Sequence, residues 1–318
     1  MRKGFVDLQV NGYQGVDFAS PTLHLEDIHR VTEDLLKAGT IGYCATIITS
    51  DMQVYRRNLP LLARAMEQNG VKGRLLGIHL EGPYLSSAEG ARGAHWAEYM
   101  HPPNLREFCE FQDWAQGQIA LLTIAPELEG AIDFIADVCR SFTTRIALGH
   151  HLASSDVLKH ATEAGASLCT HLGNGCPSLL PRHNNIIIAQ LANDRLTAGL
   201  ITDGHHLPED FIRVVFKCKG VDKIFVVSDS APIAGFAPGI YDTLGNQVRL
   251  TAEGRIENLH SCYFVGSGLH MAQCMRFLKS LGFLSDEELW QVGFENPLFI
   301  LGASMERRSL DSLPDFHF

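Results

Sequence analysis

The chain has 318 residues and lacks several features that mark particular classes of protein. No run approaches the roughly 20 apolar residues of a membrane-spanning helix. No apolar segment follows the N-terminal residues Met1–Phe5, so we expect no signal peptide. No block of Lys and Arg is present, and the formal net charge is −10. We therefore expect neither nucleic acid nor a membrane as a partner, although a local pocket could still bind a small anion.

Paired cysteines are also missing, because none of the eight cysteines belongs to a CxxC motif. Cys44 and Cys169 lie inside apolar runs, where a free thiol behaves as a small hydrophobic side chain. Reduced thiols are typical of intracellular proteins. We therefore expect the thiols to be reduced and the protein to be cytoplasmic.

The chain does contain a regular alternation of short apolar runs and segments with helical spacing. Hydrophobic residues make up 46% of the sequence, which suffices for one large core. The eight strand-like runs are Phe5–Val10, Tyr43–Thr49, Leu75–Leu80, Ile119–Ile124, Arg145–Leu148, Ala166–Thr170, Leu196–Ile201 and Lys223–Val227. Segments between them, such as Leu25–Lys37 and Asp156–Ala164, have helical periodicity. Eight βα units predict an α/β fold, a closed parallel (β/α)8 barrel of the TIM type.

The composition of the chain changes after Asp229. Residues 240–265 are rich in Gly, Thr, Asn and β-branched residues, and Leu244–Gln247 and Ala252–Arg255 have the composition of hairpin turns. We therefore predict a small, reduced β-rich appendage. In this division, residues 1–235 and 266–305 form the barrel, 236–265 are a β-hairpin insertion, and 306–318 are a tail.

Several predicted strands end in a carboxylate or an imidazole, namely Glu81, His150, His171, Asp203 and Asp229. In a parallel barrel the carboxyl ends of the strands converge on one face, so these distant residues could meet. Glu81, His150 and His171 have the composition of a catalytic zinc or iron site with one open position. A water in that position would have its pKa lowered towards about 7. The alternative is that these side chains are strand-end residues facing solvent.

Other polar residues near the strand ends suggest further roles. Asp229 could accept a proton from a metal-bound water and pass it to a leaving amine, or it could be the N-cap of the next segment. His95, in a loop, could stabilise an oxyanion or lie at the surface. Arg182 is a candidate anchor for an anion such as phosphate. A backbone NH at Asn174 or Gly175 could contact the same anion.

Several longer motifs occur in an order that resembles a known family. They are Gly4–Gly12, Gly39–Gly42, Thr46–Ser50, Ile78–Tyr84, Ala125–Glu127, Gly149-His150, Thr170–Leu172, Asp203–His206, Ser228-Asp229 and Gly266-Ser267. Through them the chain resembles the N-acetylglucosamine-6-phosphate deacetylase family of the amidohydrolase superfamily. Most amidohydrolases carry two metal-binding histidines on the first strand, where this chain has Gln9-Val10-Asn11 and where the deacetylases often lack the pair. The resemblance therefore implies a single divalent metal ion, zinc in the first place, with iron or another ion as alternatives.

The resemblance also implies a role for each matching residue. Glu81, His150 and His171 would hold the metal. Asp229 would be the catalytic acid and base, and His95 would polarise the acetyl carbonyl. The residues that would contact a phosphorylated N-acetyl amino sugar are Ala94, Asn174, Gly175, Arg182, Asp203, His206, Phe264, Val265 and Gly266. In the family the arginine reaches the neighbouring subunit's site, so the resemblance implies a homodimer that releases acetate from N-acetylglucosamine-6-phosphate.

The chain departs from the family pattern in Gly173–Pro177 and His183–Asn185. These departures leave open N-acetylgalactosamine-6-phosphate or another N-acyl compound as the substrate. A non-catalytic sugar-phosphate-binding relative and a deaminase or cyclic amidase are further alternatives. His151 could be an extra metal ligand or a residue behind the ligands, but our interpretation is a surface histidine. The chain starts at the first predicted strand and ends soon after Gly302, so we expect much of the family's small β domain to be missing.

Overall fold

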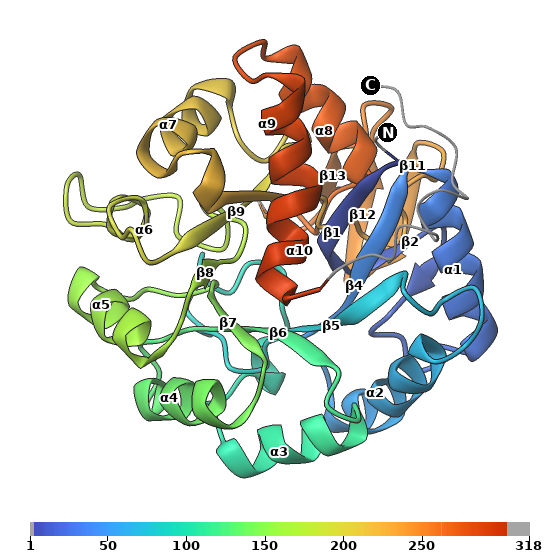
Figure 1. Ribbon diagram of the computed structural model, residues 1–318, viewed down its shortest axis with the longest axis horizontal. Coiled ribbons are helices and arrows are strands. Elements are labelled where there is room, and N and C mark those ends of the chain that lie inside the picture. The colour runs from blue at the N-terminus through green and yellow to red at the C-terminus, as the bar shows by residue number, and fades with distance from the viewer. Residues whose placement is uncertain (1–2, 262, 304–318) are drawn as a thin grey trace.

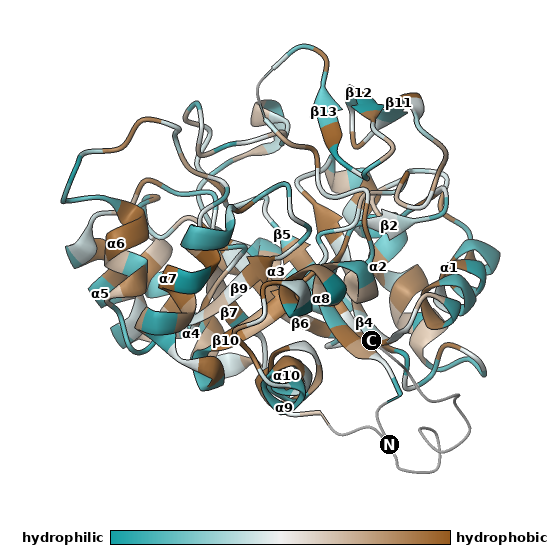
Figure 2. Ribbon diagram, turned by 90° about the horizontal axis from the view of Figure 1, so that it is seen from above, coloured by the Kyte–Doolittle hydropathy of each residue, from teal (hydrophilic) through white to brown (hydrophobic). Residues whose placement is uncertain are grey.

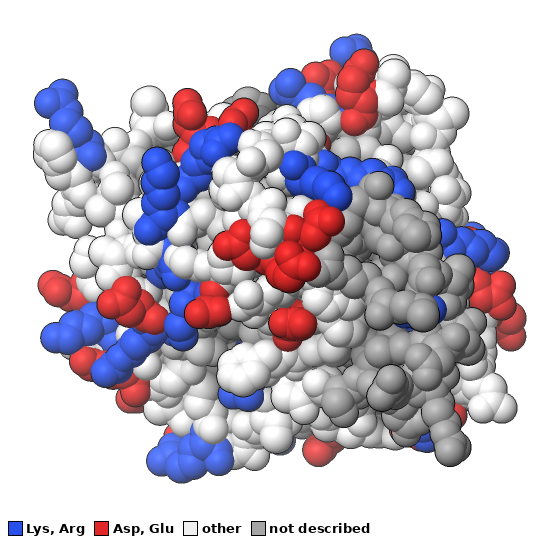
Figure 3. Space-filling view, turned by 45° about the horizontal axis from the view of Figure 1, so that its top comes forward, with Lys and Arg blue, Asp and Glu red and all other residues white. Residues whose placement is uncertain are grey.

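The computed structural model describes residues 3–261 and 263–303 of the chain. Cys262 and the predicted tail, residues 306–318, lie outside the described residues. Within the described part, no helix combines the length and the apolar character that crossing a membrane requires. Basic and acidic side chains are interspersed over the face of the molecule shown in Figure 3.

Parallel strands form a barrel at the centre of the molecule (Figure 1). In spatial order they are β1 (Phe5–Val10), β4 (Thr40–Ile48), β5 (Leu75–Glu81), β6 (Ile119–Ile124), β7 (Arg145–Leu148), β8 (Leu168–Cys169), β9 (Thr197–Ile201) and β10 (Ile224–Val227). A parallel bridge between Val10 and Ser230 returns the last strand to the first. The predicted (β/α)8 barrel is therefore confirmed. The sixth predicted strand, Ala166–Thr170, is shorter than expected at both ends, and after it the backbone turns at His171, whose φ is +28°.

Helices surround the barrel. They are α1 (Leu25–Lys37), α2 (Met52–Met66), α3 (Leu105–Trp114), α4 (Ala131–Ser141), α5 (Ser155–Ala164), α6 (Ile186–Leu191), α7 (Glu209–Lys219), α8 (Met271–Ser280), α9 (Asp286–Trp290) and α10 (Asn296–Leu301). Short turns of other helix types are η1 (Ala97–Tyr99), η2 (Val221–Lys223) and the π-helix η3 (Gln291–Glu295).

Local sequence explains where these helices begin and which face they bury. Asp51, Asn104 and Ser154 each accept a hydrogen bond from a backbone N–H in the first turn of α2, α3 and α5. Such a bond satisfies one of the donors that a helix start leaves unpaired. In α1 the buried residues Ile28, Val31, Thr32 and Leu35 recur at helical spacing, so one stripe of the helix packs on the barrel.

The two ends of the barrel are covered differently (Figure 2). At one end lies an antiparallel sheet of β11 (Gly239–Thr243), β12 (Asn246–Leu250) and β13 (Ile256–Asn258), with its own small apolar cluster. A two-stranded ribbon, β2 (Gly12–Tyr13) and β3 (Val16–Asp17), follows β1. At the opposite end, Leu298 and Ile300 of α10 join a cluster of apolar side chains from the barrel strands. The division of the chain into barrel, insertion and tail stays a prediction.

Asp7 of β1 is buried at the seam where β1 meets β10. Its carboxylate accepts hydrogen bonds from the backbone N and the hydroxyl of Ser228, at 3.1 and 2.5 Å, and from the backbone N of Gln9 at 3.2 Å. Burial nevertheless raises the pKa of Asp7 to about 7, because the charged form has been removed from water. The seam therefore contains a carboxyl group whose ionisation is unfavourable below neutral pH.

We expect Asp7→Asn to weaken the pH dependence of stability. A carboxyl group with a higher pKa in the folded state holds its proton more tightly there, so its contribution to stability falls as the pH rises from the unfolded to the folded pKa. For Asp7 this window runs from about 4 to about 7. Across this pH window, the free energy of unfolding of wild type should fall by up to about 4 kcal/mol more than that of the variant, at about 1.4 kcal/mol per pKa unit. Urea unfolding at several pH values measures this, and parallel curves for the two proteins would contradict it.

Candidate metal centre and substrate pocket

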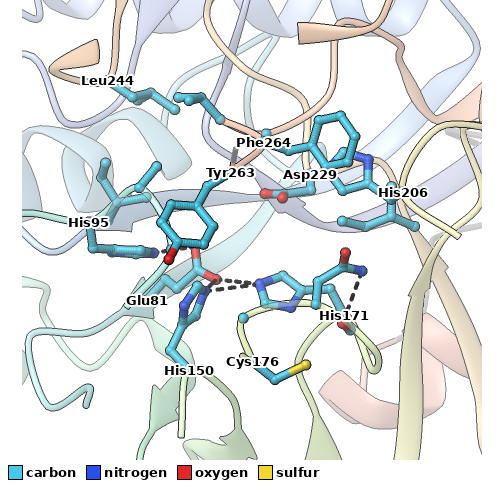
Figure 4. A pocket seen from close by; sticks show the side chains of 18 of the residues that line it. Glu81, His95, His150, His171, Cys176, His206, Asp229, Leu244, Tyr263 and Phe264 are labelled. Carbon is cyan, nitrogen blue, oxygen red and sulfur yellow. Dashed lines mark hydrogen bonds and ion pairs between the residues drawn. The ribbon is translucent and has the colours of Figure 1, made fainter. Parts of the chain in front are cut away.

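The structure brings Glu81, His150 and His171 together at the carboxyl ends of three barrel strands (Figure 4). Glu81 is the last residue of β5, while each histidine follows the end of its strand by two residues. Glu81 Oε1 lies 2.9 Å from His171 Nε2 and 3.3 Å from His150 Nε2, and the two Nε2 atoms are 3.2 Å apart. All three side chains are buried.

This geometry fits one divalent metal ion. Ligand atoms about 2.0–2.1 Å from a tetrahedral zinc lie roughly 3.3 Å from one another, close to the separations observed here. His150 Nδ1 is 2.8 Å from the carbonyl oxygen of Ala91, which can only accept. The proton of a neutral His150 is therefore on Nδ1, and the lone pair on Nε2 faces Glu81 and His171. A backbone carbonyl behind a histidine ligand is a common support for metal binding.

The backbone aims these side chains inward through an uncommon conformation. His150, His171 and Asp229 have φ values of +51°, +28° and +52°. Residues other than glycine rarely adopt this left-handed region, and where they do the surrounding structure must hold them there. Each of the three comes two residues after the end of a strand, where the change of backbone direction turns the side chain towards the pocket.

Asp229 follows β10 and shares its hydrogen-bond donors with the metal-ligand carboxylate. Its Oδ1 accepts from Asn11 Nδ2 at 2.7 Å and from Gln9 Nε2 at 3.1 Å. The same Gln9 nitrogen donates to Glu81 Oε1 at 3.0 Å. One amide group therefore stands between two buried carboxylates. Burial, followed by the charge of Glu81, raises the pKa of Asp229.

His95 lies beside the metal ligands, in the loop after β5. Its Nδ1 is 3.1 Å from Thr49 Oγ1, and its Nε2 is 3.8 Å from Glu81 Oε2. The His95 and His150 rings meet edge to face, with their centroids 4.5 Å apart. Burial, with the neighbouring His150, lowers the pKa of His95 to about 3. The imidazole is therefore neutral at ordinary pH.

A pocket with a cavity volume of about 250 Å³ opens over these groups. Most of the residues predicted to contact substrate line it, namely Ala94, Asn174, Gly175, His206, Phe264, Val265 and Gly266. Two others do not. Asp203 is buried outside the lining of the pocket, and Arg182 is exposed on the loop between β8 and α6.

The carboxylate of Asp203 is hydrogen-bonded to His206 and does not line the pocket. Its Oδ2 accepts from His206 Nδ1 at 2.7 Å and from Ser267 Oγ at 2.8 Å. Its Oδ1 accepts from the backbone N atoms of His205 and His206, both at 2.9 Å. These bonds orient the imidazole of His206, whose ring also packs against Phe264 at 4.6 Å between centroids.

His151 is buried, so our interpretation of it as a surface histidine is wrong. Its Nδ1 accepts from the backbone N of Ala153 at 3.1 Å, and its Nε2 lies 2.7 Å from the side-chain amide of Gln190. The hydrophobic pattern could not show this, because the residue that covers His151 comes from α6, almost forty positions further on.

Several residues that line the pocket were not predicted. They include Asn11, Ile48, Cys176, Leu244 and Tyr263. Cys176 and Tyr263 are sequence neighbours of predicted contacts, which was the one signal that could have indicated them. Ile48 and Leu244 have the appearance of ordinary core or turn residues, and only the packing of distant loops places them at the pocket.

No family model matches the chain, but individual proteins of known name do. The chain is 31% identical over 340 aligned positions to the N-acetylglucosamine-6-phosphate deacetylase of Homo sapiens, covering 99% of this chain and 78% of that relative. Against the Bacillus subtilis enzyme of the same name it is 30% identical over 302 positions, covering 94% and 74%.

Solved structures give the same result. The N-acetyl-D-glucosamine-6-phosphate deacetylase of Mycobacterium smegmatis matches with a TM-score of 0.87 and 27% identity, covering 96% of this chain and 79% of that one. The N-acetylglucosamine-6-phosphate deacetylase of Pasteurella multocida matches with a TM-score of 0.84 and 29% identity, covering 94% and 76%.

We expect purified wild-type protein to bind about one divalent metal ion per chain and His150→Ala to bind much less, because three protein ligands are needed for tight binding. Metal analysis by mass spectrometry after dialysis measures the ratio. His160→Ala, which removes an exposed histidine from α5, is the matched control and should retain the metal. Equal metal content in wild type and His150→Ala would contradict the site.

Proposed function

The chain belongs to the N-acetylglucosamine-6-phosphate deacetylase family, and on that premise we propose that it hydrolyses N-acetylglucosamine-6-phosphate to glucosamine-6-phosphate and acetate. The proposal rests on one observation. The buried side chains of Glu81, His150 and His171 lie close together, next to Asp229. We further propose a cytoplasmic enzyme, since the described cysteines are free thiols.

Glu81, His150 and His171 are the residues that would hold the metal ion. When bound, the ion supplies a Lewis acid that increases the acidity of water and polarises the acyl carbonyl. Two imidazoles and one carboxylate suit zinc, which we propose as the physiological ion, and also iron and other divalent ions.

Asp229 is positioned to move the proton of the reaction. Both amide donors, from Gln9 and Asn11, bond its Oδ1, so Oδ2 remains for proton transfer. Asp229 accepts a proton from the attacking water and then donates it to the departing nitrogen, which leaves as the amine. The raised pKa of Asp229 helps the carboxyl group to keep the proton between these two steps.

His95 is positioned to stabilise charge on the acyl oxygen. The Thr49 hydroxyl lies 3.1 Å from His95 Nδ1 and 3.3 Å from the backbone carbonyl oxygen of Glu81, and it can donate to one of them at a time. In the tautomer that receives the Thr49 proton at Nδ1, the ring proton is on Nε2, which is 3.8 Å from Glu81 Oε2. That N–H is a donor for the oxygen on which negative charge develops. Because the ring is neutral, it can donate without giving up its proton.

The phosphate group of the substrate requires a cation that the pocket of one chain does not offer. Among the described residues that line the pocket there is no Lys or Arg. Of the histidines that line it, His206 comes last in the sequence. Arg182 is exposed, on a loop whose Leu179 is 92% exposed. We infer that this loop packs against a second copy in a homodimer, where Arg182 binds the phosphate in the partner's pocket.

Amine release from N-acetylglucosamine-6-phosphate by metal-loaded protein tests the function. Asp229→Asn should lower kcat by about 100-fold or more, because general acid–base catalysis contributes about 10²–10⁴ in rate. Asp210→Asn, an exposed residue of α7, is the control and should behave as wild type. Equal rates for wild type and Asp229→Asn would contradict the mechanism. A higher rate on N-acetylgalactosamine-6-phosphate would instead reassign the substrate.

Mixing two impaired variants tests the role of Arg182. Arg182→Ala alone should raise KM by about 10-fold or more, since a charged hydrogen bond contributes about 1.5–3 kcal/mol. In a heterodimer of Arg182→Ala with Asp229→Asn, the pocket with intact Asp229 receives Arg182 from the other subunit. The kcat/KM of the purified heterodimer should then be about half that of wild type, with the KM of wild type. If Arg182 served its own chain's pocket, neither site would be complete, and the heterodimer would keep the raised KM of Arg182→Ala.

A further inference from the structure

Tyr263 and Phe264 lie on the turn between β13 and α8, which is tied to the backbone that carries Asp229. The backbone N of Ser267 donates to the carbonyl oxygen of Asp229, and the backbone N of Ala231 donates to that of Ser267, both at 2.8 Å. A Cβ atom at Gly266, whose φ is +65°, would lie 2.8 Å from the Asp229 carbonyl oxygen. The close approach therefore requires glycine and holds the preceding aromatic residues over the pocket.

The two aromatic side chains lie on different sides of the pocket. The Phe264 ring packs on His206, and the guanidinium of Arg255 lies over it at 5.2 Å, so Phe264 covers the His206 side. Tyr263 covers the metal-ligand side. In Figure 4 its ring stands over Glu81 and its hydroxyl end points towards Glu81 and His95.

The hydroxyl of Tyr263 has no hydrogen-bond partner among the residues that the structure describes. Its backbone N, by contrast, donates a hydrogen bond to Ser261 Oγ at 3.4 Å. The side-chain amides of Asn11 and Asn174 each have one N–H directed elsewhere, to Asp229 and to the carbonyl of His171. A hydroxyl directed into a polar pocket is therefore available to a bound substrate.

We propose that Tyr263 is a further catalytic residue, whose hydroxyl donates a hydrogen bond to the acyl oxygen of the substrate alongside His95. The inference rests on the proposed amide hydrolysis, in which that oxygen gains negative charge. A donor that is already in place stabilises this charge without reorganising solvent. Removing one such donor from an enzyme typically costs about 10²–10³ in kcat. Because His95 and a bound metal ion would also stabilise this oxygen, we expect a smaller loss here.

Replacing Tyr263 by phenylalanine removes the hydroxyl and keeps the ring. We expect kcat of Tyr263→Phe on N-acetylglucosamine-6-phosphate to fall by about 10–100-fold, with KM changed less than about threefold, because the interaction strengthens only as charge develops. Tyr241→Phe is the matched control. Its hydroxyl bonds the carbonyl of Ala237 at 2.8 Å, away from the pocket, and its kcat should equal that of wild type.

The N-trifluoroacetyl analogue of the substrate separates stabilisation of charge from a structural effect. Fluorine withdraws electrons from the reacting carbon, so the developing oxyanion depends less on hydrogen-bond donors. The loss caused by Tyr263→Phe should then be at least about threefold smaller on the analogue. Metal content and thermal midpoint, measured on the same preparations, should equal those of wild type.

The outcomes distinguish the two proposals. If wild type does not release amine from either substrate, the proposed function fails and the role of Tyr263 fails with it. If wild type is active and Tyr263→Phe has the same kcat, only the role of Tyr263 is overturned. A rise in KM alone, or equal losses of kcat on both substrates, would also overturn it. If Tyr263→Phe loses metal or unfolds, Tyr263→His, which restores a donor, must recover activity on the acetyl substrate for the proposal to stand.

Discussion

The seam between the first and last barrel strands is the constraint on which both the fold and the site depend. The bridge between Val10 and Ser230 closes the barrel, and the backbone N of Asp229 donates to the carbonyl oxygen of Gln9 at 3.0 Å. The side chain of Gln9 then donates to Glu81 and Asp229 together. Two buried carboxylates so close would repel one another, and an amide nitrogen between them reduces that cost. If the barrel did not close at this seam, the catalytic carboxylate would have neither its place nor its donors.

Positioning in this protein is achieved largely by short turns at the carboxyl ends of strands. Strand ends in a parallel barrel converge, but a side chain that merely continued the strand would alternate between the two faces of the sheet. Left-handed backbone at His150, His171 and Asp229 removes that alternation. The loop that carries His95 and the turn that carries Tyr263 then close over the same space. The barrel provides rigidity, and the loops provide the chemical groups that a particular substrate requires.

A local sequence pattern predicts structure correctly where it is compatible with one structure. Alternating apolar runs predicted the barrel, and polar residues at their ends predicted that Glu81, His150 and His171 could meet, as they do. The prediction failed for His151, because the burial of a polar residue depends on what packs over it, here Gln190 of a later helix. The contact of Asp203 with substrate stays a prediction; in the structure its carboxylate accepts hydrogen bonds from His205, His206 and Ser267. Tyr263 was missed because no periodic pattern marks a turn residue that reaches across a pocket.

The sequence by itself determined the class of fold and the type of chemistry, because hydrophobic periodicity and strand-end ligands act over a few neighbouring residues. Only the tertiary structure decided which groups touch. It placed Gln9 between two carboxylates, set Asp203 behind His206, buried His151 and brought Tyr263 over Glu81. These relations join residues up to 220 positions apart. They depend on barrel closure and on the packing of loops, which involve the whole chain at once and leave no trace in any short stretch of it.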